Sequence, residues 1–329
     1  MSNSSTPRIL VSGETLIDFL PERSGPLSEV PTFERRPGGA PANVAVALSR
    51  LNETPWFWTR IARDPFGDYL AKVLDADLPD RFVERDADAK TTLAFVTHDE
   101  TNDRAFTFYR DETADTRLQP GGVSDEALAE VDWVYVGGVM LASDPARTAT
   151  FDLAERANEA GCSVIFDPNA RPELWSEGGG ADEGVEFAEA VDEMLSLVDV
   201  MKATPEDLEM AGFDGEDAAS LAANVCEAGP HTCLLTLGGD GAHAHASDDA
   251  PWEAGSATHG GYDVSVVDTT GAGDAFTAGA LAALADDVSG GSLDAVLEFA
   301  NAVAALTTTE PGAMTALPDR AAVAELRES

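Results

Sequence analysis

The chain has 329 residues, 44% of them apolar, so it is long enough to bury a large core and too apolar for a disordered chain. It carries 60 acidic and 20 basic residues, a formal net charge of -40, and the missing basic footprint excludes nucleic acid as a partner. It has no apolar run of about 18 residues that could span a membrane, and no secretory signal pattern at its N-terminus. We therefore expect a soluble, cytoplasmic protein without a membrane partner.

The acidic residues are spread along the whole chain and do not gather in one tail. Like charges at this density repel one another and destabilise a compact state in dilute buffer, whereas concentrated salt screens the repulsion. This balance favours a protein built for molar intracellular salt, as in an extreme halophile, over an acidic partner for a basic protein. The three cysteines lack Cys-x-x-Cys spacing, which favours reduced thiols over a metal site or a disulfide framework.

Short β-branched runs alternate with Ala-rich amphipathic stretches, a pattern typical of βα units and a mainly parallel sheet. We expect strands at residues 8–12, 55–59, 133–136, 163–167, 198–202 and 233–237. We expect helices at residues 41–51, 66–74, 145–160, 185–195, 205–211, 218–227, 272–284 and 293–307.

Two regions, about 16–36 and 91–111, break this rhythm, because apolar and polar residues alternate there without an intervening helix. Antiparallel strands inserted into a parallel fold often cover a site, so we expect these two pieces to form a small lid. No linker composition divides the chain, and we expect a single domain over residues 1–329.

The strongest chemical signal is the segment DTTGAGD at residues 268–274, which follows an expected strand at 264–267 and opens a helix. Backbone N–H groups at a helix N-terminus favour an anion, and Gly271 and Gly273 let the backbone approach it closely. Asp274 could accept a proton from an attacking hydroxyl. The alternative from spacing alone is a tight turn in which Asp274 only caps the helix.

A second signal is GGAPAN at residues 38–43, which opens another expected helix. Gly38 and Gly39 allow close approach of a ligand, and Asn43 can both donate to and accept from a hydroxyl, which suits a polyol. An ordinary loop before a helix is the alternative. A Walker A loop is excluded, because none of the three lysines follows a glycine.

Together the two motifs, in this order and with this long gap, resemble those of the pfkB (ribokinase-like) family of carbohydrate kinases, and the resemblance extends over essentially the whole chain. It implies an α/β fold: a ribokinase-like three-layer sandwich with a mainly parallel central sheet and a small antiparallel β lid. It also implies an ATP-dependent sugar kinase that transfers a γ-phosphate to a sugar hydroxyl and uses Mg²⁺.

The family's motifs imply roles for individual residues. Asp274 is similar to the catalytic base, and the amides of Gly271, Ala272 and Gly273 resemble the anion hole. The implied substrate-binding residues are Asp18, Gly38, Gly39, Asn43, Arg110, Asn169 and Arg171. The implied nucleotide-binding residues are Thr204, Thr236, Gly238, Gly239, Gly241 and Asn301.

The metal sites resemble those of the family less closely. Many relatives carry Asn-x-x-Glu where this chain has Thr204-Pro205-Glu206-Asp207, so Asp207 takes the position linked to Mg²⁺ through water. A K⁺ site formed by backbone carbonyls would fall at Asp268, Thr270, Thr307, Glu310 and Gly312.

Three segments resemble those of fructokinases: GGAPAN at 38–43, FTFYR at 106–110 and DPNAR at 167–171. They favour fructose, as in a fructokinase or a ketohexokinase, with 2-keto-3-deoxygluconate as the nearest competitor and ribose or a nucleoside as further alternatives. A catalytically silent sugar-binding protein is the remaining hypothesis from another class. The family resemblance also implies a homodimer formed through the lid. The sequence does not indicate which hydroxyl is phosphorylated.

Overall fold

The computed structural model describes residues 7–23, 25–98, 104–176, 180–285 and 292–328. Within them the main sheet has nine strands in the order β13-β12-β11-β10-β9-β8-β1-β4-β5. Neighbouring strands from β11 to β5 are parallel, whereas β12 and β13 extend one edge antiparallel. The strands are β1 (Ile9–Ser12), β4 (Trp56–Ala62), β5 (Val83–Asp86), β8 (Trp133–Gly137), β9 (Ser163–Asp167), β10 (Val200–Ala203), β11 (Thr232–Thr236), β12 (Ala242–Ala246) and β13 (Gly255–His259).

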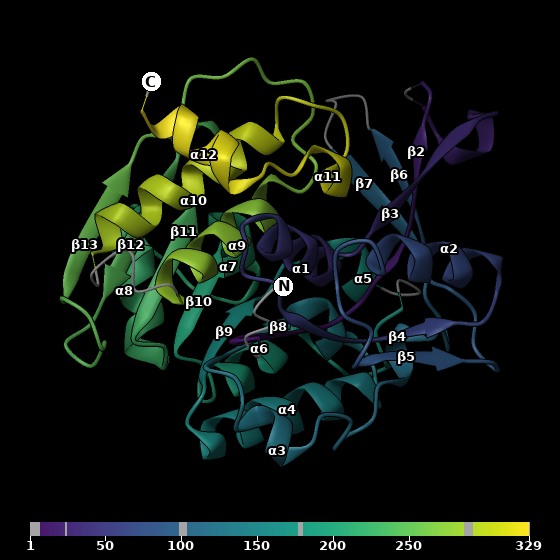
Figure 1. Cartoon of the computed structure of the whole chain (residues 1–329), viewed down its shortest axis with the longest axis horizontal. Helices are drawn as coiled ribbons and strands as arrows, with labels where there is room; N and C mark the ends of the chain where they lie inside the picture. Colours follow the sequence, from purple (N-terminus) through teal and green to yellow (C-terminus); the bar gives the residue numbers. More distant parts are fainter. Residues whose placement is uncertain (1–6, 24, 99–103, 177–179, 286–291, 329) are drawn as a thin grey trace, which may run out of the picture.

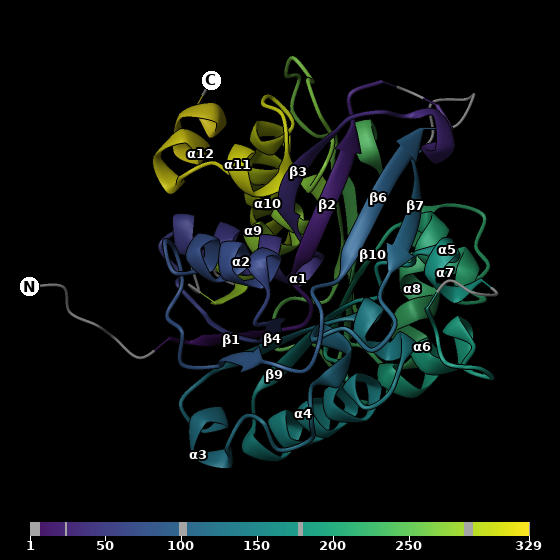
Figure 2. The same ribbon diagram turned by 90° about the vertical axis from the view of Figure 1, so that its right-hand side faces the viewer.

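Helices cover both faces of the main sheet, because successive strand residues point to opposite faces. In β1, Ile9 and Val11 belong to the core shared with α1, α9 and α10, whereas Leu10 belongs to the core shared with α4, α6 and α8. The two helix layers are visible in Figures 1 and 2. The helices are α1 (Ala40–Arg50), α2 (Pro65–Leu74), α3 (Asp125–Leu128), α4 (Ala146–Ala160), α5 (Pro172–Trp175), α6 (Phe187–Leu195), α7 (Pro205–Met210), α8 (Ala218–Ala228), α9 (Ala272–Ala285), α10 (Leu293–Thr307), α11 (Ala313–Ala316) and α12 (Arg320–Arg327).

Local signals start and stop several of these helices. The Asp64 carboxylate accepts the Gly67 N–H at 2.8 Å, and Pro65 occupies the first turn of α2. Helix α4 ends at Gly161, whose φ of 83° is left-handed. Among the described residues, none of the helices combines the length and the apolarity needed to cross a bilayer.

The two regions without an expected helix form a second sheet in the order β3-β2-β6-β7. Its strands are β2 (Leu16–Pro21), β3 (Phe33–Gly38), β6 (Leu93–His98) and β7 (Arg104–Tyr109). β2 pairs antiparallel with β3, β6 pairs antiparallel with β7, and β2 and β6 join the two pairs in parallel. Figure 2 shows these strands side by side, projecting from the main sheet away from α3 and α4. We call this sheet the lid.

One expected strand is wrong. Residues 264–267 lie outside any strand, and Val266 and Val267 are each 61% exposed. The chain leaves the sheet edge after β13 and crosses to the start of α9, so this apolar run finds no neighbouring strand to pair with. The Val267 N–H instead donates to the Thr308 carbonyl oxygen at 2.8 Å.

Candidate active site

Two adjoining cavities lie at the start of α9. The first, about 400 Å³, lies between the lid, the start of α1 and the carboxyl ends of β9 and β10, and we call it the lid cavity. The second, about 370 Å³, is bordered by the glycines after β11, and we call it the glycine-loop cavity. Thr204, Thr269 and Gly273 line both of them, so the two cavities meet at the helix N-terminus.

Most of the predicted site residues line these cavities. The lid cavity is lined by Asp18, Gly39, Asn43, Asn169, Arg171, Thr204, Asp207, Thr270, Gly271, Gly273 and Asp274 from that set. The glycine-loop cavity is lined by Thr204, Thr236, Gly238, Gly239, Gly241, Ala272, Gly273 and Asn301. Segments far apart in sequence therefore converge on one place.

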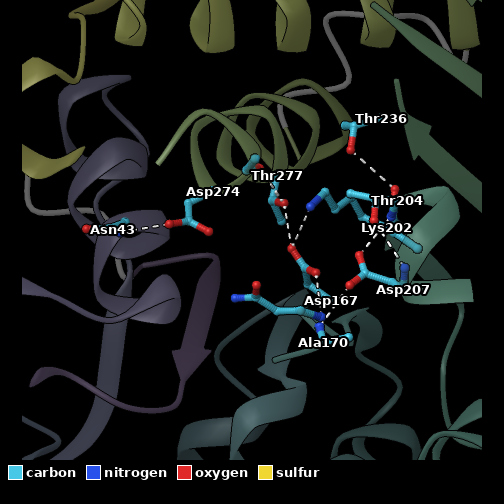
Figure 3. Close-up of polar contacts among 12 residues, drawn as sticks. Asn43, Asp167, Ala170, Lys202, Thr204, Asp207, Thr236, Asp274 and Thr277 are labelled. Carbon is cyan, nitrogen blue, oxygen red and sulfur yellow. Dashed lines mark hydrogen bonds and ion pairs between the residues drawn. The ribbon is translucent and has the colours of Figure 1, made fainter. Parts of the chain in front are cut away.

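Asp274 lies in the first turn of α9 and faces α1. Its Oδ2 accepts a hydrogen bond from Asn43 Nδ2 at 2.7 Å (Figure 3). Burial raises the pKa of the Asp274 carboxyl, the hydrogen bond from Asn43 opposes the rise, and the charge of Asp167 adds to it. A carboxylate with a raised pKa at this position is suited to accept a proton from a hydroxyl in the lid cavity.

The turn before Asp274 depends on glycine. Gly271 has φ of +76°, and a Cβ there would lie 2.6 Å from the Cβ of Ala313. Gly271 and Gly273 line the lid cavity, while the Ala272 N–H is directed at the Thr269 carbonyl oxygen, 3.3 Å away. The start of α9 can therefore stabilise an anion where the cavities meet.

The second glycine motif makes room for a carboxylate. A Cβ on Gly38 would lie only 2.0 Å from Asp18 Oδ2, so any larger residue at 38 would displace Asp18. Gly38 itself does not line the lid cavity, and it bears on the site through the space it leaves for Asp18. Asn43 Oδ1 is buried without a hydrogen-bond partner among the described residues. Asn43 thus offers an acceptor to a ligand hydroxyl, and Asp18 lines the same cavity.

The turn after β9 holds two further predicted residues. Asn169 has φ of 42°, and its N–H donates to Asp167 Oδ1 at 3.1 Å. The guanidinium carbon of Arg171 lies 5.3 Å from the ring centre of Phe106 on lid strand β7. Arg171 therefore connects the segment after β9 to the lid, and both residues line the lid cavity.

The side chain of Arg110, for which a substrate contact was predicted, is buried. It does not line the lid cavity, and it is 2% exposed, with Nε donating to Asp115 Oδ2 at 2.7 Å. The alternation of β7 directs Phe106 and Phe108 into the cavity, and Arg110 follows beyond the end of the strand, where the chain enters the core. Asp115, 1% exposed, neutralises the guanidinium there.

Glu14 lines the lid cavity although no role was predicted for it. It is 2% exposed, and its Oε1 accepts the Ala40 N–H at 3.2 Å, which connects the end of β1 to the start of α1. Burial raises the pKa of the Glu14 carboxyl to about 7, and Arg110 opposes the rise. Its position directly after a parallel strand was the signal that could have identified it.

We expect Glu14→Gln to change how stability depends on pH. Because the folded protein holds this proton up to about pH 7 and the unfolded chain only up to about pH 4.5, wild-type stability falls as pH rises through that window. Gln mimics the protonated carboxyl. The variant should therefore gain up to about 3 kcal/mol of unfolding free energy relative to wild type between pH 4.5 and pH 8.

Urea unfolding across that pH range, at constant molar KCl, measures this gain. The exposed Glu216→Gln is the matched control and should track the wild type at every pH. Parallel pH profiles for wild type and Glu14→Gln would show that the Glu14 carboxyl is ionised throughout.

A buried ion pair beside Asp274 was also missed. Lys202 Nζ lies 3.0 Å from Asp167 Oδ2, and both side chains are buried (Figure 3). Thr277 Oγ1 donates to the same carboxylate oxygen at 3.2 Å. Burial alone would lower the pKa of Lys202, but Asp167 and Asp207 outweigh it and raise that pKa, so Lys202 is a cation at neutral pH.

The glycine-loop cavity has an apolar wall and a polar floor. Val264, Val266, Phe276 and Ala304 provide apolar surface, and Asn301 lies among them on α10. Gly238, Gly239 and Gly241 border the other side, after β11. An apolar slot beside glycines and a helix N-terminus fits a nucleotide. Its base would lie in the slot and its phosphates toward Gly273.

Asp207 is held by backbone amides on two sides. Its Oδ1 accepts the Ala170 N–H at 2.8 Å and its Oδ2 accepts the Thr204 N–H at 2.8 Å. The Thr204 hydroxyl in turn caps helix α7 by accepting the Asp207 N–H at 3.2 Å. Each carboxylate oxygen keeps a lone pair, so the residue suits a metal contact through water better than a direct one.

The predicted carbonyl site is organised by Asp268. Asp268 Oδ1 accepts the Thr270 N–H at 2.9 Å, and its Oδ2 accepts the Gly312 N–H at 2.8 Å. The Thr307 hydroxyl donates to the Val303 carbonyl oxygen within α10. Asp268 thus brings the loop before α9 against the segment that includes Glu310 and Gly312.

Known proteins resemble this chain over nearly its whole length. The family model described as pfkB family carbohydrate kinase matches residues 6–320. Fructokinase-1 of Zea mays is 37% identical over 330 residues, which cover 96% of each protein. A fructokinase of Vibrio alginolyticus is 33% identical over 318 residues, which cover 94% of this chain and 96% of that protein.

Solved structures agree with the sequence comparison. The crystal structure of a fructokinase with bound ATP from Xylella fastidiosa superimposes with a TM-score of 0.83 at 32% identity, covering 98% of both chains. A putative ribokinase II from E. coli, at 23% identity, shares the fold with a TM-score of 0.82. The chain belongs to the pfkB family of carbohydrate kinases, and the expected ribokinase-like fold is confirmed.

Proposed function

We propose that this protein is an ATP-dependent fructokinase. The observation that carries the proposal is the meeting of the two cavities at the start of α9, with a buried carboxylate on the side of the lid cavity. A sugar in the lid cavity and ATP in the glycine-loop cavity would place an acceptor hydroxyl and a γ-phosphate on the two sides of Gly273. The fructokinase of Xylella fastidiosa, with ATP bound, has the same fold.

The reaction then needs only groups already described. The sugar oxygen attacks the γ-phosphorus, Asp274 accepts the hydroxyl proton, and the start of α9 stabilises negative charge on the phosphoryl group. Phosphoryl transfer depends mainly on positioning and electrostatics, so this set is sufficient. A silent sugar-binding protein would have no use for a buried proton acceptor at this junction.

The charges lining the lid cavity favour a neutral sugar over 2-keto-3-deoxygluconate. Asp18 lines the cavity and would repel a substrate carboxylate or compete with it for a cation, and Glu14, whose pKa is raised to about 7, adds to the repulsion once it is ionised. Arg110, one of two arginines that could have bound such a carboxylate, is paired with Asp115 behind the cavity. Arg171 and the Asp167-paired Lys202 are the basic residues left in the lining to bind the acid.

Two kinds of metal ion belong to this proposal. Mg²⁺ would accompany ATP near Asp207, through water, and would supply Lewis-acid stabilisation of the phosphates. K⁺ would be held by carbonyl oxygens near Asp268 and Gly312. In support, a related fructokinase from Vibrio cholerae, 29% identical, is described with fructose, ADP and potassium ion bound.

The outer face of the lid supports the proposal of a homodimer. Phe95 stacks on Phe19, with ring centres 4.8 Å apart, and contacts Phe33 and Tyr109 edge-on. Tyr109 is 60% exposed, so this aromatic cluster reaches the surface. A second copy of the lid is the partner that the family resemblance implies.

We also propose that the enzyme works in a cytoplasm rich in salt. The three thiols, Cys162, Cys226 and Cys233, are unpaired. Burial raises the pKa of each, so they are protonated and unreactive. The net charge of -40 supports a halophilic origin.

A sugar panel tests the function. Phosphorylation of fructose, 2-keto-3-deoxygluconate, ribose, glucose and adenosine would be measured with ATP and Mg²⁺ in molar KCl. We expect fructose to have the highest kcat/KM, with NMR of the product locating the phosphate. Preference for the keto-deoxy acid would assign Arg171 to its carboxylate, and binding of sugar without turnover of any of them would support the silent binder.

A further inference from the structure

Lys202 lies against the helix N-terminus where the cavities meet. It is near the end of β10, and its Nζ is 3.3 Å from the position that a Cβ on Gly273 would occupy. Both residues line the lid cavity, and Gly273 also lines the glycine-loop cavity. In Figure 3 the ammonium lies beside α9, between Asp167 and the helix. The Lys202 ammonium therefore lies close beside the backbone of Gly273.

Cations are scarce around the lid cavity. Its basic lining residues are Lys202 and Arg171, and its acidic lining residues are Glu14, Asp18, Glu206, Asp207 and Asp274. A γ-phosphoryl group bound there brings further negative charge next to these carboxylates. A fixed positive charge at the junction would stabilise that group further, and a lysine ammonium is a common point-charge ligand of phosphate.

Lys202 is held by Asp167, which lines neither cavity. One of its three N–H groups meets Asp167 Oδ2, and that carboxylate is itself fixed by Thr277 Oγ1 and by the Asn169 N–H. Such a carboxylate orients the ammonium and leaves two N–H groups for another acceptor. Asp167 therefore acts as a positioning residue.

We propose that Lys202 is a catalytic residue that binds the transferring phosphoryl group. This inference rests on the proposed function and adds a cation to the amides of α9. The bond from the sugar oxygen to the γ-phosphorus forms, the bond from that phosphorus to the ADP oxygen breaks, and the hydroxyl proton moves to Asp274. Lys202 stays protonated throughout and contributes charge alone.

Three variants test it. Lys202→Met keeps the length of the side chain without its charge and should lower kcat on the order of 10²–10³-fold, as for loss of one oxyanion donor. That variant leaves the Asp167 carboxylate buried without its cation and could fail to fold. Lys202→Met with Asp167→Asn removes both charges while Asn keeps an acceptor for the Asn169 N–H, so it should fold and still be slow. The exposed Lys72→Met is the matched control and should keep wild-type kcat.

A binding measurement separates catalysis from structure. We expect the double variant to bind ADP as the wild type does and to lose at least tenfold in affinity for a non-hydrolysable ATP analogue, because only the analogue carries a γ-phosphate near Lys202. A double variant with kcat within a few-fold of wild type, or with equal losses for both nucleotides, would overturn the proposal. If the wild type phosphorylates no sugar, the proposed function fails, while the comparison of ADP with the analogue still decides whether Lys202 binds the γ-phosphate.

Discussion

Asp274→Asn is expected to lower kcat by about 10²–10⁴-fold while leaving ATP binding nearly intact. Asn has almost the same shape, and its side-chain oxygen can still accept the hydrogen bond that Asn43 Nδ2 now donates to Asp274. It cannot accept the proton of the sugar hydroxyl. The loss should therefore appear in kcat and not in the Kd of ATP, since the nucleotide occupies the neighbouring cavity.

The chain offers a matched control for this variant. Asp294 lies in the first turn of α10 as Asp274 lies in the first turn of α9, but it is exposed. Asp294→Asn should keep wild-type turnover. Steady-state kinetics and calorimetric binding of ATP to the three proteins measure both quantities, and an Asp274→Asn enzyme within a few-fold of wild type would remove Asp274 from the mechanism.

The sheet and helices were largely predictable because each element carries its own signal. β9 and β10 begin and end within two residues of their predicted bounds, since buried β-branched runs and capped Ala-rich helices alternate along the chain. The segment at 264–267 shows the limit of this reasoning. Its valines resemble a buried strand, but whether a strand forms depends on a neighbouring edge that a local pattern does not reveal.

The parts of the site that were missed depend on pairing between distant segments. Phe166 pairs with Met201 in the parallel register of β9 and β10, and this places Asp167 beside Lys202. A one-residue change of register would point these side chains to opposite faces. The motif residues, by contrast, were recognisable because glycine and aspartate at fixed spacing already describe a turn and a helix start.

Arg110 is a case in which a motif suggested a role and packing between segments decides where the side chain lies. Its motif suggested a substrate contact, yet the fate of a buried guanidinium is decided by the nearest carboxylate, and the chain provides Asp115 five residues later. Glu14, by contrast, lines the cavity, and the pKa of its carboxyl is raised to about 7. The electrostatics of this site follow from packing, which sequence motifs do not encode.

Concentrated KCl is expected to raise the thermal midpoint of the protein strongly. The net charge of -40 is spread along the chain, and the Debye length shortens from about 10 Å at 0.1 M salt to about 3 Å at 1 M, which screens repulsion between neighbouring carboxylates. A gain of several kcal/mol from this screening would raise Tm on the order of 10 °C for a chain of this size. Differential scanning calorimetry from dilute buffer to molar KCl measures the shift.

Sucrose at matched osmolarity separates screening from general stabilisation by excluded solutes, because it strengthens burial without screening charge. If charge repulsion limits stability, KCl should raise Tm far more than sucrose does, and most of the rise should be complete once the Debye length is shorter than the spacing of surface carboxylates. Exposed ion pairs such as Arg8–Asp132 are screened by the same salt, so they act against the rise. A Tm that is equal in dilute buffer and in molar KCl would show that these opposing contributions cancel and that the acidic surface is not an adaptation to salt.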